Sequence, residues 1–202
     1  MKKQINIGTY YQCFSTNFIG NPAIQDWDFN IIDLDKDFEK SFKNIGRGEF
    51  YNIDINGDTL EDLEEEDLNK LMEAYVKFFN NCELKDEYKS VFKNDFQNIL
   101  YIENIGILPK YNYNLIGKVI GDIFERFAQK STLIIINPTL LNVTVENNNI
   151  SIESKEGTLR EIKTFEDKNK KLFGYLGFTE IDGYYLFDCI NFSEELIDEL
   201  YL

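Results

Sequence analysis

The stretch that decides the fold reads ILYIENIGI at Ile99–Ile107, then LPKYNYN, then LIGKVIGDIFERFAQ at Leu115–Gln129, and closes with TLIII at Thr132–Ile136. The first and last segments are apolar runs of strand length that end at Pro109 and at Asn137-Pro138. The middle segment places apolar residues at helical spacing. A strand, a loop, a helix and a strand in this order predict two parallel strands joined by a crossover helix.

Weaker patterns lie on both sides of this unit, and we find no repeat, linker or low-complexity tract. We therefore expect a single mixed α/β (α+β) domain over residues 1–202. On the N-terminal side the patterns predict strands around 5–14, 28–33 and 49–55, and helices over 35–44, 59–80 and 84–96. On the C-terminal side they predict a hairpin of 141–145 with 150–154, a helix over 168–176 closed by Gly177, strands 179–181 and 184–187 turning at Asp182-Gly183, and a last helix over 193–202.

The charge balance and the absence of histidine limit the chemistry. The 202 residues include 21 Lys+Arg, 36 Asp+Glu and no His, which gives a formal net charge of −15. Without histidine the chain cannot build a Ser-His-Asp triad, a Cys-His dyad or a His-ligated metal site. The acidic balance argues against a nucleic-acid partner, and it suits a cationic substrate such as an amine, or a basic protein partner.

Cysteine use and hydropathy bear on the compartment. The three cysteines, Cys13, Cys82 and Cys189, are widely spaced and indicate reduced thiols. The first residues contain no apolar signal core, and the longest apolar run, Leu133–Ile136, is too short to span a bilayer. We therefore expect a cytoplasmic protein without a membrane partner, and the oligomeric state stays open.

One acidic segment resembles a calcium-binding loop. Asp54, Asn56, Asp58 and Glu65 occupy positions 1, 3, 5 and 12 of an EF-hand pattern. The position that requires glycine is Thr59, and the preceding segment is a predicted strand instead of a helix. We therefore predict a turn leading into an acidic helix, and no metal site.

The loop after Ile107 leads into the start of a helix. Such a loop exposes backbone N–H groups where the helix dipole favours a phosphate, and Lys110 and Lys118 flank it. An ordinary strand-to-helix turn is the alternative interpretation of these residues.

Two strings resemble the GCN5-related N-acetyltransferase (GNAT) superfamily. LYIENIGILPKY at Leu100–Tyr111 resembles the fourth strand of that family, and KLFGYLGFTEI at Lys171–Ile181 is similar to its late signature. Leu133–Pro138 falls where the family has its fifth strand. The resemblance covers about residues 98–190, the expected acetyl-CoA-binding core, and leaves 1–97 as a divergent part. It implies a twisted mixed sheet whose parallel central strands splay apart, flanked by helices.

The resemblance also implies a site and a reaction. Acetyl-CoA would lie between the two splayed strands, and a primary amine would attack its thioester. Glu103 would be the general base and Tyr175 a candidate acid for the departing thiolate. The expected cofactor contacts are the backbone groups of Ile105 and Ile107 for the pantetheine arm, and the amides of Tyr113, Asn114, Leu115, Ile116, Gly117 and Lys118 for the pyrophosphate.

The chain departs from the family pattern at both motifs. Asn112 replaces the usual Arg or Gln of the phosphate loop, Leu115 replaces its middle glycine, and only Gly117 is retained. In the second motif Phe173 stands where many relatives have a tyrosine. Two functions therefore stay open: an acetyl-CoA-dependent N-acetyltransferase acting on a primary amine of a small molecule or a protein, and a catalytically inactive acidic interaction protein that binds a basic partner.

Overall fold

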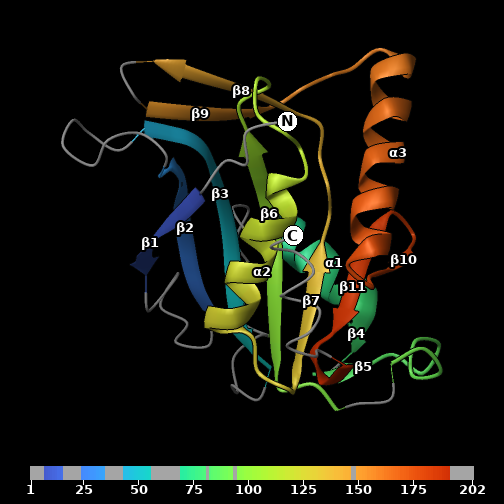
Figure 1. Cartoon of the computed structure of the whole chain (residues 1–202). Helices are drawn as coiled ribbons and strands as arrows, with labels where there is room; N and C mark the ends of the chain where they lie inside the picture. The colour runs from blue at the N-terminus through green and yellow to red at the C-terminus, as the bar shows by residue number, and fades with distance from the viewer. Residues whose placement is uncertain are drawn as a thin grey trace.

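A computed structural model describes residues 7–15, 24–34, 43–55, 69–80, 82–92, 95–146 and 149–191. Its centre is a seven-stranded sheet with the order β1-β2-β3-β6-β7-β11-β10 (Figure 1). Every neighbouring pair in this sheet is antiparallel except β6 and β7. The strands are β1 (Ile7–Ser15), β2 (Ile24–Asp33), β3 (Lys43–Asp54), β6 (Asn98–Ile107), β7 (Thr132–Ile136), β10 (Thr179–Ile181) and β11 (Tyr184–Asp188).

The crossover predicted from the sequence is confirmed. β6 and β7 are parallel neighbours, and α2 (Leu115–Phe127) connects them. Their pairing runs from Asn98 opposite Thr132 to Ile102 opposite Ile136. β6 continues along β3 as far as Ile107, so it extends five residues beyond its last partner in β7.

Helices cover both faces of the sheet. Leu100 and Ile102 point into a core shared with α2 and α3 (Leu159–Tyr175), and we call this side the α2/α3 face. Ile99 and Tyr101 point the opposite way, into a core shared with α1 (Asn69–Phe78), which we call the α1 face. This alternation along one strand is expected where both faces are buried.

A second, two-stranded sheet packs over the end of β6. β8 (Leu141–Glu146) and β9 (Asn149–Ser154) form the hairpin predicted from the sequence. A Cβ at Gly106 would lie 2.8 Å from Val143 Cγ2 and 3.0 Å from Ile152 Cδ1, so the glycine permits the hairpin to approach the strand closely. A further pair, β4 (Phe79–Asn80) and β5 (Glu83–Leu84), follows α1.

Some of the predicted helices differ from the structure. The segment 84–96 was predicted as a helix, but its described part consists of β5 followed by consecutive turns. The Lys85 amide donates to the Phe78 carbonyl at 2.9 Å, so the chain reverses there against α1. α3 is longer than the predicted 168–176, and Gly177 ends it with φ +81° as expected. The segments 35–42, 56–68 and 193–202 lie outside the described residues. Residues 43–44, the end of the helix predicted over 35–44, are instead the start of β3.

None of the described helices is long and apolar enough to cross a membrane. Within the described ranges we also find no group of three or more Cys, Asp or Glu residues arranged to hold a metal ion. Most of the calcium-like segment, from Asn56 on, lies outside those ranges.

Candidate functional site

A cavity of about 510 Å³ lies where β6 continues beyond the end of β7. Ile102, Ile136 and Phe173 line its inner end, at the last β6–β7 pair. Lys155, Arg160 and Glu161 line its outer end, where α3 begins. The walls between are mostly apolar and include Ile105, Ile107, Ile116, Leu140, Val143 and Phe165.

Glu103 lines this cavity from a β-bulge. Asn104 pairs with Glu49 of β3 and Ile102 pairs with Phe50, which leaves Glu103 without an opposite residue. A bulge of this kind locally changes the direction of side chains and is frequent beside active sites. Tyr51 of β3 hydrogen-bonds the Glu103 carboxylate, and burial together with the Glu103 charge raises the pKa of this tyrosine.

Other carboxylates on the neighbouring strands share this environment with Glu103. Burial raises the pKa of Asp26, and the charges of Asp28, Glu49 and Glu103 raise it further. Burial also raises the pKa of Glu49, although a hydrogen bond from Asn104 and the charge of Arg47 lower it. Arg47 forms ion pairs with Asp28 and Glu49 and offsets part of this charge. The region beside Glu103 is still net negative, and such a field attracts a cation.

Asn104 connects the carboxylates to the cavity. Its Nδ2 donates to Glu49 Oε2 at 3.0 Å, and its Oδ1 is buried without a hydrogen-bond partner among the described residues. Asn104 also lines the cavity. A buried acceptor without a partner is costly, so this oxygen is suited to accept an N–H from a ligand.

The loop before α2 uses its own amides. The Asn114 N–H donates to Asn112 Oδ1 at 3.1 Å. The amides of Leu115, Ile116 and Gly117 donate to the carbonyls of Asn112, Tyr113 and Asn114 at 3.0 to 3.1 Å. The first turn of α2 is thus hydrogen-bonded within the loop, and these four N–H groups are not directed at a ligand.

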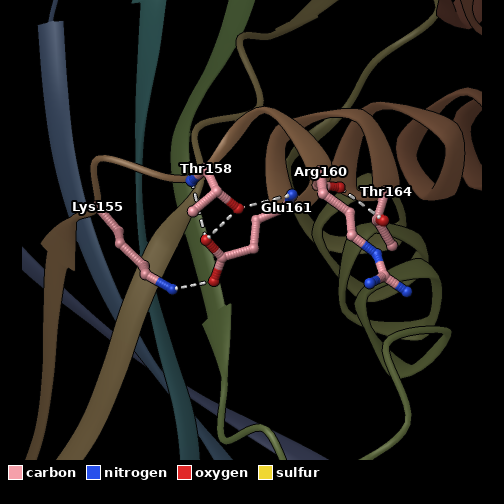
Figure 2. A network of polar contacts seen from close by, with 5 residues as sticks. All are labelled: Lys155, Thr158, Arg160, Glu161 and Thr164. Carbon is pink, nitrogen blue, oxygen red and sulfur yellow. Dashed lines mark hydrogen bonds and ion pairs between the residues drawn. The ribbon is translucent and has the colours of Figure 1, made fainter.

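A capping box begins α3 at the outer end of the cavity. The Thr158 hydroxyl accepts from the Glu161 amide at 3.3 Å, and Glu161 Oε2 accepts from the Thr158 amide at 2.9 Å. Lys155, just after β9, donates to Glu161 Oε1 at 2.7 Å, as Figure 2 shows. These contacts lower the pKa of Glu161 to about 2, with the Lys155 hydrogen bond as the largest cause.

Two further cations of α3 line the cavity. The Arg160 guanidinium extends away from Glu161 and makes no hydrogen bond or ion pair with any described residue (Figure 2). The Lys168 ammonium lies 5.8 Å from the centre of the Tyr113 ring. The Tyr113 hydroxyl donates to the buried Asn169 Oδ1, which fastens the loop against α3. Burial raises the pKa of Tyr113.

The structure brings about half of the sequence-predicted site residues together. Of the predicted site residues, those that line the cavity are Glu103, Ile105, Ile107, Tyr113 and Ile116. Leu115 and Gly117 are buried within α2 and do not line the cavity. Asn114 and Lys118 also lie outside the cavity lining. Tyr175 is 62% exposed at the end of α3, outside the cavity lining. The roles assigned to these residues stay predictions.

Sequence reasoning missed the polar residues at both ends of the cavity. Tyr51 reaches Glu103 only through the register of β3 against β6, which no local pattern specifies. Arg160 was missed because the helix was predicted to begin at Lys168. The string TLRE at Thr158–Glu161 is a complete capping-box signature and would have placed the helix start correctly.

We compared the chain with protein-family models, curated proteins and solved structures, and none of them matches it.

Proposed function

We propose that this protein is an acetyl-CoA-dependent N-acetyltransferase with a GNAT-like fold, acting on a primary amine. The observation that carries the proposal is the cavity just beyond the last residue pair of β6 and β7, the only parallel pair among the described strands, with the bulged Glu103 among its lining residues. The resemblance of Leu100–Tyr111 and Lys171–Ile181 implies a donor bound beside these two parallel strands, and the position of the cavity supports this proposal.

The free edge of β6 is suited to the donor's pantetheine arm. β3 pairs with one edge of β6 as far as Ile107, whereas the described strands leave the other edge unpaired beyond Ile102. We propose that backbone groups of Ile105 and Ile107 pair with the amides of that arm as a further strand would. The apolar walls would exclude water from the thioester.

Glu103 would act as the general base, directly or through a water. The carboxylate takes a proton from the substrate ammonium, and Tyr51 holds the carboxylate in place. When bound, acetyl-CoA supplies the carbonyl carbon that the amine attacks: a carbon–nitrogen bond forms, the carbon–sulfur bond breaks, and the thiol leaves with one of the two protons that the ammonium loses. A backbone amide near Ile105, just after the bulge, would stabilise the developing oxyanion.

The neighbouring carboxylates support an amine as the acceptor. Asp26 and Glu49 lie close enough to Glu103 for its charge to raise both of their pKa values. A cationic acceptor would relieve this repulsion as it binds, and an anionic acceptor would add to it.

The proposal is tested by ligand-induced stabilisation. A ligand that binds only the folded state adds about 2.7 kcal/mol at a hundredfold excess over its Kd, or roughly 5–10 °C in Tm for a chain of this size. We expect acetyl-CoA to give such a shift and ADP, which lacks the pantetheine arm, to give a much smaller one. Thiol release on addition of primary amines then measures turnover. An absent shift, or an equal shift with ADP, would reject the proposal.

Specific observations favour a second candidate, an inactive acidic protein that binds a basic partner. The amides of residues 114–117 donate hydrogen bonds within the loop. Phe173 stands where many GNAT proteins have a tyrosine that acts as an acid, and its ring packs 4.6 Å from that of Tyr185. Under this interpretation acetyl-CoA causes no shift, and polylysine binds with a strong dependence on salt.

A further inference from the structure

The cavity carries opposite charges at its two ends. Glu103 and Asn104 lie on β6 beside the acidic residues of β2 and β3. At the outer end two cations, Lys155 and Arg160, accompany one carboxylate, Glu161, and Lys168 lines the cavity about 12 Å further along α3, beside Tyr113. In a chain with a formal net charge of −15, three cations around one cavity are a local reversal of sign.

These cations are placed to act on a ligand. Among the described residues neither the Arg160 guanidinium nor the Lys168 ammonium makes an ion pair or hydrogen bond, and the Lys168 ammonium lies over the Tyr113 ring. Only Lys155 is engaged, with Glu161. The capping box fixes the helix turn that carries Arg160, so its backbone is held at the cavity mouth.

The loop before α2 offers less to an anion. Four of its amides donate within the loop, and the Tyr113 side chain lies between the loop and α3. An anion at the start of α2 would have to displace these hydrogen bonds. An anion near α3 would instead meet a guanidinium with five free donors.

We propose that Arg160 and Lys168, supported by Lys155, bind the phosphate groups of the acyl donor, in place of the amides at the start of α2. This inference rests on the proposed function. The ligand is therefore an extended molecule. Its reactive end lies near Glu103, its middle lies between the apolar walls of the cavity, and its anionic end lies at α3. From Arg160 to Phe173 the helix rises about 20 Å, which gives room for an extended arm between the two ends.

Binding measurements with three probes test the inference: CoA, pantetheine, which lacks the phosphates, and inorganic pyrophosphate. We expect CoA to bind the unmodified protein more tightly than pantetheine. Arg160→Gln and Lys168→Gln should each weaken CoA binding about tenfold or more, because each removes a charge-assisted contact, and should leave pantetheine binding unchanged. Lys163→Gln is the matched control, since Lys163 is exposed on the same helix and outside the cavity lining.

The outcomes separate this inference from the proposed function. If CoA binds the double variant R160Q/K168Q as tightly as the unmodified protein, the inference is wrong and donor binding stands. If Lys118→Gln weakens CoA binding instead, the phosphates bind at the start of α2. If CoA does not bind at all, the proposed function fails, and the pyrophosphate measurement decides on the anion site. Pyrophosphate binding that is lost in R160Q/K168Q would support the anion site. Absence of pyrophosphate binding to the unmodified protein would overturn it.

Discussion

Glu103 is the residue on which the proposed chemistry depends most. Its place in a bulge separates it from the regular pairing of β3 with β6, and Tyr51 hydrogen-bonds its carboxylate. The sequence pointed to Glu103 through the family resemblance. The contact of Tyr51 with Glu103 could not be predicted in the same way. It depends on the bulge, which shifts the register of β6 against β3, and no local sequence pattern indicates that bulge.

We expect Glu103→Gln to lower turnover by about two to four orders of magnitude while CoA affinity stays the same. The carboxamide retains the size of the side chain and removes its basicity. Turnover and CoA affinity measured on the same preparations provide the check. Glu153→Gln, an exposed position on β9, is the matched control and should retain full activity. Unchanged turnover in Glu103→Gln would transfer the role of base to another carboxylate.

Among the elements, α3 shows where sequence patterns succeed and fail. Apolar runs of strand length predicted β6 and β7, which are buried on both faces, and apolar residues at helical spacing predicted α2, which is buried on one face. The first part of α3 is mostly exposed, so it lacks an apolar stripe, and its start is specified by capping instead. The opposite error occurred at 84–96, where apolar residues at helical spacing pack on the α1 face from successive turns.

Thr158→Ala should lower the free energy of unfolding by about 1 kcal/mol, because the alanine cannot accept from the Glu161 amide. Thr158→Ser should retain most of the stability. Thr164→Ala, in which the lost hydroxyl donates to the Arg160 carbonyl within the helix, is the control with a small expected effect. Midpoints of urea unfolding measure all three variants, and equal losses in Thr158→Ala and Thr158→Ser would show that the hydroxyl does not cap the helix.

The pH dependence of the same cap has a definite sign. The pKa of Glu161 is lowered from 4.5 to about 2 in the folded protein. Its contribution to stability is therefore present above pH 4.5 and is lost as the pH falls toward 2. The difference in unfolding midpoint between the unmodified protein and Glu161→Gln should shrink over that range, and a constant difference would contradict the assignment.

At the scale of the whole molecule, chain order and sheet order differ at the last strands. β11 lies between β7 and β10, although both β10 and β11 follow β7 in the chain. The β10–β11 turn uses positive φ values at Asp182 (49°) and Gly183 (84°), as the predicted two-residue turn requires. The hairpin thus completes the sheet by pairing with β7, whose five residues are all buried.

This arrangement has a consequence for synthesis on the ribosome. Until residues 179–188 emerge, β7 presents the edge TLIII, an apolar β-branched segment with open hydrogen-bonding groups, and such edges recruit other chains. We expect a chain ending at Gly177 to enter inclusion bodies, whereas a chain ending at Asn191 retains the hairpin and stays in the soluble fraction. Fractionation of cell lysates separates the two, and equal solubility would mean that the nascent edge is protected by other means. If the shorter chain alone aggregates, pairing of the β10–β11 hairpin with β7 is the step after which each newly made chain no longer aggregates.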